Sequence, residues 1–548
     1  MPTPVPSAIW PNLDPCRVFS TCALRRSWRR LLCLPVIRPL PTDCSLSRAY
    51  RCRPWKTRSL RESTEVNFID DVIQKFPFSQ EAVIAIDAEG GRKVHYFSHL
   101  FARSMGLSGA MLARGVRRGD VVMILVGSRI EWVISMLACF RMGAVALPLN
   151  PQLTGTDLAY RVAETNPALV IGEERYLANL GDGVPYLDMA DLERIFDEDL
   201  DQATPAAAAD LSPSDPALIV FTSGSTGEPK GVIHSQSYLL GQATQAEHWL
   251  GAGKGDLVWC TAAPGWSKSS RNSFIAPWLR GAKSLLVDAR FEPDSRLDTA
   301  RREGVNVLCQ APTEYRILAK RTEVAPVPGL KRMVSAGEAL NAEVIEVFRE
   351  SIGLEIADGY GQTETGQVTG IRPGDRLAGR EGSMGRPLPG IETRIVDEEL
   401  QVRAATSPTF FSSYIDGSTF DGEWWATGDM VTEDEEGFLF HQGRNDDVIS
   451  SAGYRIGPVE VESALLTHPR IAEAAAIAAP DPERGSVVKA VIVLREGEPD
   501  DELVAEIQQH CREATAPYKY PRIVEFLDVL PKTPSGKIKR AELRARQV

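Results

Sequence analysis

The sequence contains 548 residues, of which 43% are hydrophobic and 24% are charged, and its formal net charge is −12 at pH 7. This length suffices for several domains, and the composition excludes a collagenous or wholly disordered chain. The charge is uneven, because residues 1–60 contain 11 Lys and Arg residues against Asp14 and Asp43. The rest of the chain is strongly acidic, which argues against general binding to nucleic acid or to an anionic membrane.

Residues 1–62 form a basic leader. Its Arg-rich segment LRRSWRRLLCL, at positions 24–34, is typical of a mitochondrial presequence. The same composition also fits an unstructured tail or a mis-assigned start. We predict a mitochondrial matrix protein if the leader is a transit peptide, and a cytoplasmic protein otherwise. No uncharged apolar stretch reaches the ~18 residues that span a bilayer, so the sequence predicts no transmembrane segment.

From about residue 64, short β-branched segments alternate with longer amphipathic segments. The predicted strands are Val121–Val126, Ala144–Leu149, Leu169–Gly172, Leu218–Phe221, Leu257–Thr261, Leu285–Asp288, Val305–Cys309 and Arg332–Ser335. Helices are predicted between them, for example over Glu131–Met142 and Asn341–Ser351. Continuous apolar strands separated by helices indicate an α/β fold with a largely parallel sheet covered on both faces. Ligands of such folds bind at the carboxyl ends of the strands.

The last hundred residues have a different pattern, which predicts a small α+β domain. Its predicted elements are the helix Val459–Thr467, the strands Ala474–Ala478 and Val487–Leu494, the helix Asp501–Cys511 and the strand Ile523–Phe526. We therefore predict three parts: the leader at 1–62, a large domain at 63–445 and a small domain at 446–548.

The strongest chemical signal is the segment FTSGSTGEPKG at 221–231, directly after a predicted strand. Its glycines allow tight turns that aim backbone N–H groups at one point, and its hydroxyls and lysine add further donors. The segment lacks the Gly-Lys-Ser/Thr step of a Walker A loop. It predicts a phosphate-binding loop; a Gly/Ser-rich surface loop is the alternative. The candidate residues are Thr222, Ser223, Gly224, Ser225, Thr226, Gly227 and Lys230.

This segment resembles the phosphate-loop signature of the adenylate-forming superfamily, which includes acyl-CoA synthetases, luciferases and peptide adenylation domains. Six further segments agree with that family in order and spacing, and together they cover residues 65–545. The resemblance implies a large N-terminal domain of parallel-sheet α/β subdomains with a small β-barrel-like part. It also implies that the C-terminal domain is mobile.

Four of these segments imply an ATP and AMP site. Tyr360 would stack on adenine, Thr363 would contact the α-phosphate, Glu364 would hold Mg²⁺, and the Asp429 carboxylate would accept from the ribose hydroxyls. The other residues implied to bind the nucleotide are Gly337, Glu338, Ala339, Asp358, Gly359, Gly361, Gln362, Arg444 and Lys537.

The C-terminal segments imply catalytic and CoA-binding residues. Lys537 takes the place of the family's adenylation lysine, which neutralises charge in the transition state together with Thr222 and Glu364. Asp446 takes the place of the hinge residue about which the small domain turns. The implied CoA-binding residues are Gly453, Tyr454, Arg455, Arg484 and Arg512, although the arginines also fit as plain surface residues.

Residues 259–268 (WCTAAPGWSK), 276–281 and 309–315 look most like the medium-chain acyl-CoA synthetase branch. The likeness implies that Trp266 and Gln310 line the acyl pocket; core packing is the alternative for Trp266. One departure from the family is the region 395–402, which is short, as if a turn between two strands were missing.

The sequence thus predicts an ATP-dependent carboxylic acid:CoA ligase. The acid, medium-chain by resemblance, would attack ATP to give acyl-AMP and pyrophosphate, and the CoA thiol would then displace AMP. The implied ligands are ATP, Mg²⁺, CoA and a small carboxylic acid. Two alternatives remain open: an adenylating enzyme that loads a separate carrier protein, and an inactive relative that binds acyl ligands or nucleotides.

Overall fold

The computed structural model describes residues 65–153, 155–180, 183–197, 207–222, 229–338, 340, 342–451, 454–482, 484–533 and 536–546. The side chains of residues 177–179, Arg455 and Pro517 are not part of this description. The predicted leader at 1–62 lies outside the described residues. The remaining chain, from residue 63, forms one compact unit.

The first sheet has seven strands in the described part of the chain, in the order β18-β8-β7-β4-β3-β5-β6. These are β3 (Val121–Leu125), β4 (Val145–Pro148), β5 (Leu169–Gly172), β6 (Tyr186–Leu187), β7 (Pro216–Phe221), β8 (Gly231–Ser235) and β18 (Ser413–Tyr414). The strands from β7 to β6 pair in parallel, whereas β8 and β18 are antiparallel. The segment between β7 and β8 therefore leaves the sheet at the carboxyl end of β7, where the phosphate loop was expected.

A nine-stranded sheet of described residues has the order β15-β14-β13-β12-β11-β9-β10-β1-β2. These are β1 (Glu81–Ile86), β2 (Arg92–Tyr96), β9 (Leu257–Cys260), β10 (Lys283–Val287), β11 (Val307–Gln310), β12 (Arg332–Ala336), β13 (Ile356–Gln362), β14 (Gly366–Gly370) and β15 (Arg386–Pro387). The strands from β13 to β1 are parallel, and β2, β14 and β15 add antiparallel edges. The predicted parallel α/β architecture is confirmed.

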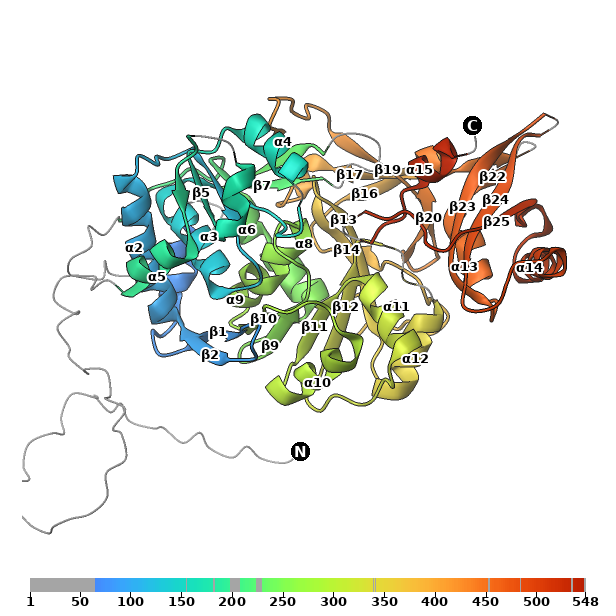
Figure 1. Ribbon diagram of the computed structural model, residues 1–548, viewed down its shortest axis with the longest axis horizontal. Coiled ribbons are helices and arrows are strands. Elements are labelled where there is room, and N and C mark those ends of the chain that lie inside the picture. The colour runs from blue at the N-terminus through green and yellow to red at the C-terminus, as the bar shows by residue number, and fades with distance from the viewer. Residues whose placement is uncertain are drawn as a thin grey trace, which may run out of the picture. The chain divides into compact units, whose positions relative to one another are not determined.

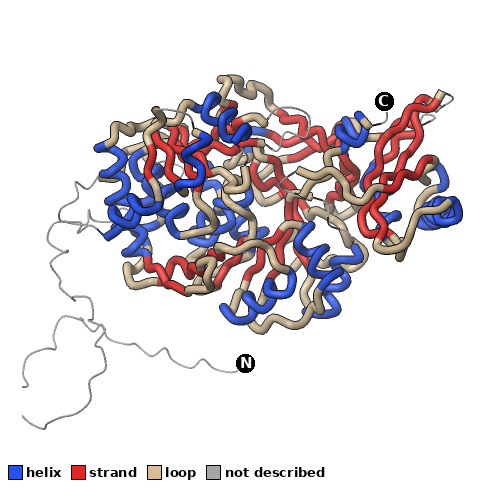
Figure 2. The backbone as a smooth tube through the Cα atoms, in the orientation of Figure 1, coloured by secondary structure: helices blue, strands red, loops and turns tan. Residues whose placement is uncertain are grey.

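Helices cover these two sheets (Figures 1 and 2). The core cluster that contains the apolar helix α3 (Ile130–Met142) also contains Val122 of β3 and Leu286 of β10, so α3 packs between the sheets. The other helices longer than eight residues in the large domain are α2 (Phe97–Ala113), α4 (Gly155–Thr165), α5 (Met189–Asp197), α10 (Pro293–Glu303), α11 (Pro312–Arg321) and α12 (Ala342–Ile352). Among the described residues, no helix has the length and apolar character needed to cross a bilayer.

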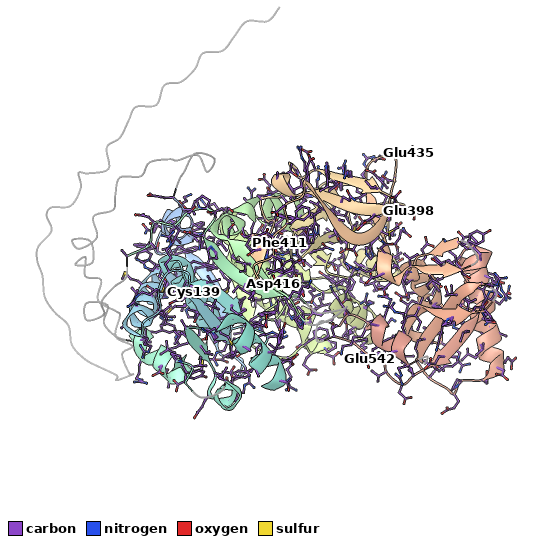
Figure 3. All side chains as sticks on the ribbon, turned by 90° about the horizontal axis from the view of Figure 1, so that it is seen from above. Cys139, Glu398, Phe411, Asp416, Glu435 and Glu542 are labelled. Atoms are coloured by element: carbon purple, nitrogen blue, oxygen red, sulfur yellow. The ribbon has the colours of Figure 1, made fainter. Side chains whose placement is uncertain are left out.

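The third sheet is a four-stranded antiparallel ladder of β16 (Thr393–Val396), β17 (Glu399–Arg403), β19 (Trp424–Glu433) and β20 (Leu439–Arg444). β16 and β17 are joined by Asp397 and Glu398, which have φ values of 50° and 66°. Two consecutive residues with positive φ form the tightest hairpin connection. The shortened region at 395–402 is thus a complete hairpin; Glu398 lies at its tip and its carbonyl accepts from the Val431 N–H at 2.8 Å (Figure 3).

The C-terminal part has a separate core. Its strands are β21 (Ile449–Ser451), β22 (Tyr454–Ile456), β23 (Ile471–Asp481), β24 (Gly485–Leu494) and β25 (Ile523–Phe526), and its helices are α13 (Pro458–Leu466), α14 (Asp501–Ala514) and α15 (Arg540–Ala545). β23 and β24 are antiparallel, and β25 adds in parallel. The apolar cluster of this part contains only residues from Ile449 onward. The predicted smaller α+β domain is confirmed, while the boundary at 445/446 stays a prediction.

Candidate active site

A cavity of about 2360 Å³ lies where the carboxyl ends of β9 and β13, the strands β19 and β20, and the C-terminal part meet. The site residues that line it come from segments that are far apart in the sequence. They are Thr222, Lys230, Trp266, Gly337, Glu338, Asp358, Gly359, Tyr360, Gly361, Gln362, Thr363, Glu364, Asp429, Arg444, Asp446 and Lys537. The fold thus brings most of the predicted residues to one place.

Some predicted residues are not part of this arrangement. Ser223, Gly224, Ser225, Thr226, Gly227, Ala339 and Gly453, together with the Arg455 side chain, lie outside the described residues. Four described residues, Gln310, Tyr454, Arg484 and Arg512, do not line the cavity.

Asp429 is the centre of a hydrogen-bond network on the cavity wall. Its Oδ2 accepts from the Tyr360 hydroxyl at 2.5 Å and from the Gln362 amide at 2.9 Å, and its Oδ1 lies 3.0 Å from His441 Nε2. Arg444 Nη1 lies 3.8 Å from Oδ2. β13 supplies the tyrosine and the glutamine, and the paired strands β19 and β20 supply the other groups. The sheet pairings therefore fix the orientation of a buried carboxylate.

This network determines the charge of Asp429. Burial alone would raise the pKa of its carboxyl, but His441, the Tyr360 hydroxyl and Arg444 outweigh burial and hold the pKa below its usual range. Burial and the negative charge of Asp429 in turn raise the pKa of Tyr360 well above its usual value. At neutral pH the pair is therefore an ionised carboxylate that accepts from a neutral phenol.

The pKa of Asp358 is shifted in the opposite direction to that of Asp429. Its side chain is buried, and burial raises its pKa to about 8 against the opposing charges of Lys268 and Arg316. Its Oδ1 atom has no hydrogen-bond partner among the described residues. A mostly protonated carboxyl is neutral, so Asp358 adds little charge to this wall of the cavity.

Glu364 contacts Tyr414, which lies close to Lys230. Its carbonyl accepts from the Phe411 N–H at 2.8 Å, and its Oε1 accepts from the Tyr414 hydroxyl at 3.1 Å. Lys230 Nζ lies 5.4 Å from the centre of the Tyr414 ring. Within the described ranges, no group of three acidic, histidine or cysteine side chains could hold a metal by itself. A single carboxylate suits Mg²⁺ only if phosphate oxygens supply other ligands.

The loop that carries Lys537 reaches the cavity next to Thr313 and Glu338. Gly536 has a φ of +92°, and a Cβ at this position would lie 3.2 Å from Thr313 Oγ1 and 3.4 Å from Glu338 Oε1. The backbones of Thr533 and Lys537 are joined by an N–H···O bond of 2.8 Å. A glycine is thus required where the loop approaches the large domain, and this approach places Lys537 on the cavity wall.

The predicted acyl pocket is only partly reproduced. Trp266 lines the cavity at the start of α8 (Ser267–Ser270). Gln310 is fully buried on β11, and its backbone carbonyl accepts from Lys268 Nζ at 3.0 Å, as does that of Ala336. Gln310 therefore positions Lys268 rather than lining the cavity with its side chain.

The described residues proposed for CoA lie on the small domain. The Tyr454 ring is 53% exposed and stacks on Tyr518 with ring centres 4.4 Å apart. The Arg484 N–H donates to Asp481 at 2.8 Å, and the Arg512 guanidinium lies 4.0 Å from the centre of the Tyr520 ring. These positions neither join the nucleotide cavity nor form a common cluster among the described residues.

Lys268, Tyr414 and His441 are among the cavity residues that sequence reasoning missed. Lys268 follows Trp266 by two positions, so its place in the same segment was a usable signal. Tyr414 and His441 stand in no local motif, and only the pairing of β18 with β8 and of β20 with β19 brings them to the site.

Comparison with known proteins gives consistent matches. A family model described as AMP-binding enzyme matches residues 69–432, and one described as AMP-binding enzyme C-terminal domain matches residues 460–537. An uncharacterized acyl-CoA ligase, YtcI, of Bacillus subtilis is 35% identical, over 90% of this chain and 98% of its own. The mouse acyl-coenzyme A synthetase ACSM3, mitochondrial, is 37% identical over 88% of this chain and 90% of its own.

A solved structure of similar fold is the anthranilate CoA ligase AuaEII in complex with anthranoyl-AMP. It has a TM-score of 0.78 and 29% identity, and the match covers 88% of this chain and 98% of that one. Its coverage includes both the large and the small domain, which agrees with the two family models.

Proposed function

Because the chain belongs to the AMP-binding enzyme family and is an acyl-CoA ligase, we propose that it joins a medium-chain carboxylic acid to CoA through an acyl-AMP intermediate. One observation supports the proposal above all others: Asp429, Glu364 and Lys537, from three distant segments, line one cavity. The medium-chain part rests on the likeness of residues 259–268 to that branch of the family.

We place ATP along the wall formed by β13 and β19. The adenine would stack on Tyr360 beside Asp358, whose carboxyl is mostly neutral at pH 7 because its pKa is raised to about 8. The ribose hydroxyls would donate to the ionised Asp429. Tyr360, Gln362 and His441 occupy three of the about four acceptor positions of this carboxylate, so binding both ribose hydroxyls would require one of the three to be released.

In the first step the acid's carboxylate oxygen attacks the α-phosphorus of ATP, and the bond to pyrophosphate breaks. Negative charge builds up on the transferring group, and the Lys537 ammonium would neutralise part of it, with Thr222 and Lys230 at the phosphate-loop ends. Mg²⁺, held by Glu364 and phosphate oxygens, would supply further charge neutralisation when bound. The products are acyl-AMP and pyrophosphate.

In the second step the CoA thiolate attacks the acyl carbonyl carbon, and AMP leaves. Lys537 would have to leave the cavity for CoA to enter, and we assign the turn to Asp446, at the junction proposed between the domains 63–445 and 446–548. Arg444 Nε donates to Asp446 at 3.2 Å, so the turn would exchange this contact for another.

The proposal is tested by measuring pyrophosphate release and acyl-CoA formation by the full-length protein with ATP, Mg²⁺ and acids from acetate to decanoate and benzoate. We expect release that depends on both the acid and CoA, with the highest kcat/KM at six to ten carbons. Acid-dependent release without acyl-CoA would favour transfer to a carrier protein. No release with any acid would favour an inactive relative.

We also propose that residues 1–62 direct the protein to mitochondria, since this leader is basic and a similar mouse protein is named mitochondrial. A fusion of residues 1–62 to a fluorescent protein should co-localise with mitochondria, and diffuse fluorescence would favour the cytoplasmic alternative.

A further inference from the structure

Tyr414 lines the cavity beside the end of the proposed phosphate loop. It belongs to β18, which pairs antiparallel with β8. The Ile415 N–H donates to the Gly231 carbonyl at 2.9 Å, and the Tyr414 N–H donates to the Ser418 carbonyl at 2.8 Å. A Cβ at Gly231 would clash with the Ile415 side chain, so the two segments are in tight contact. The backbone of Tyr414 is therefore fixed next to Lys230, the residue that precedes Gly231.

The segment before Tyr414 is bound to the turn that carries Glu364. The Thr409 hydroxyl donates to the Thr365 carbonyl at 2.8 Å, and the Phe411 N–H donates to the Glu364 carbonyl at 2.8 Å. These bonds fix the backbone of Glu364. They leave the direction of its carboxylate to side-chain contacts.

The Tyr414 side chain contacts two opposite charges of the cavity wall. Its hydroxyl donates to Glu364 Oε1 at 3.1 Å, and Lys230 Nζ lies over its ring, 5.4 Å from the ring centre. An ammonium at this distance is attracted by the π-electrons of the ring. Burial and the charge of Glu364 raise the pKa of Tyr414, so the phenol stays protonated and donates at neutral pH. One side chain thus orients both an anion and a cation.

Glu364 and Lys230 form no ion pair with each other in the described part of the chain, although both contact Tyr414 and both line the cavity. Opposite charges attract each other strongly where water is partly excluded, so two unrestrained side chains here would tend to pair. Such a pair would occupy carboxylate oxygens that suit Mg²⁺ and ammonium protons that suit phosphate. The neutral phenol occupies only one acceptor position of Glu364 and holds Lys230 through the ring.

We propose that Tyr414 is a positioning residue for acyl-AMP formation, which orients Glu364 towards Mg²⁺ and Lys230 towards the phosphates of ATP and keeps the two charges from pairing with each other. The inference rests on the proposed function, because it concerns the site at which ATP would react. Tyr414 transfers no proton in this role and acts only through Glu364 and Lys230.

The test removes the two contacts of Tyr414 in turn. Tyr414→Phe keeps the ring beside Lys230 and deletes the hydroxyl, whereas Tyr414→Leu deletes both contacts. Tyr186→Phe is the matched control. Tyr186 lies on β6, at the opposite edge of the same sheet, its hydroxyl donates to the Gly172 carbonyl at 2.7 Å, and it does not line the cavity. The control therefore also loses one phenol hydrogen bond, at a distance from the site.

The first readout is binding in the absence of turnover. Mn²⁺, as a probe for Mg²⁺, is titrated into the full-length protein with ATP but without acid or CoA, and bound Mn²⁺ is measured by electron paramagnetic resonance. We expect Tyr414→Phe to weaken Mn²⁺ binding roughly 10-fold, because Glu364 loses a hydrogen bond to its charged group. Tyr414→Leu should weaken it about threefold more, since the attraction of Lys230 to the ring is also lost. Tyr186→Phe should bind as the wild type does.

The second readout separates positioning from a general loss of structure. In Tyr414→Phe the Mg²⁺ concentration at half-maximal acyl-AMP formation should rise roughly 10-fold, whereas thiolation of pre-formed acyl-AMP should stay within about twofold of the wild type. The melting temperatures of Tyr414→Phe and Tyr186→Phe without ligands should be similar, because each variant loses one phenol hydrogen bond.

The outcomes also separate the inference from the proposed function. Unchanged Mn²⁺ binding in Tyr414→Phe, or no Mn²⁺ binding by the wild type with ATP, would overturn the assignment of Tyr414. Equal losses in both half-reactions would show that Tyr414 has only a structural role. If Mn²⁺ binding depends on Tyr414 but no acid is activated, the proposed function fails while the effect of Tyr414 on the nucleotide site stands.

Discussion

Replacing Lys537 by alanine separates the two half-reactions. Lys537 is exposed, and its loop is held by backbone bonds to Thr533 and by the close approach of Gly536 to Thr313. Truncation of its side chain therefore leaves the loop in place and removes only the ammonium. Loss of one donor aimed at developing charge costs about 3–4 kcal/mol, or roughly 100- to 1,000-fold in rate. We expect that loss in acyl-AMP formation.

The assay follows acid-dependent pyrophosphate release for the first half-reaction and CoA consumption with pre-formed acyl-AMP for the second. The second rate should stay within about twofold of the wild type, because thiolation does not need an ammonium at the α-phosphate. Lys539→Ala is the matched control: its ammonium lies 3.7 Å from Glu542 in an exposed pair worth about 0–1 kcal/mol. Equal losses in both half-reactions, or an equal loss in the control, would refute the assignment of Lys537.

Three further predictions concern the cavity wall. Asp429→Asn removes the charge that accepts from Tyr360 and should raise the KM for ATP roughly 10- to 100-fold, whereas an unchanged KM would exclude a ribose contact. The pKa of Asp358 is raised to about 8, so between pH ~4 and 8 the folded state holds a proton that the unfolded state has lost, and the free energy of unfolding falls as pH rises. In Asp358→Asn the melting temperature should therefore depend less on pH over this window than in the wild type. Parallel pH profiles of the two melting temperatures would contradict the raised pKa. Gly536→Ala places a Cβ on a residue with a φ of +92°, which destabilises this loop conformation by about 1–2 kcal/mol. The variant should therefore slow acyl-AMP formation about tenfold and leave the rate of thiolation unchanged. A slowed thiolation step would count against this reasoning.

Local sequence determined much of the fold. Leu169–Gly172 and Ile523–Phe526 are strands with the predicted bounds, because both segments contain the β-branched and apolar residues that favour strands. The predicted strand Ala474–Ala478 extends to Ile471–Asp481, since pairing with β24 continues beyond its apolar centre. Strand pairing, rather than local composition, decided where this element ends.

The meeting of the residues proposed for the nucleotide was also predictable, since they stand in motifs with fixed spacing. The segment proposed as the phosphate loop begins at the end of β7. Tyr360, Asp429 and Lys537 line one cavity, as the resemblance implied. Gln310 was expected in the acyl pocket from its segment alone, but it is buried, as are the other three residues of the central strand β11, and it does not line the cavity.

Only the tertiary structure decided the electrostatics of the cavity. The sequence determined which side chains exist: an aspartate at 429 and an aspartate at 358. Their charge states and roles depend on distant partners, because His441 and Arg444 keep Asp429 ionised while burial keeps Asp358 protonated. Charge interactions and desolvation depend on distance through space, and distance along the chain does not determine them.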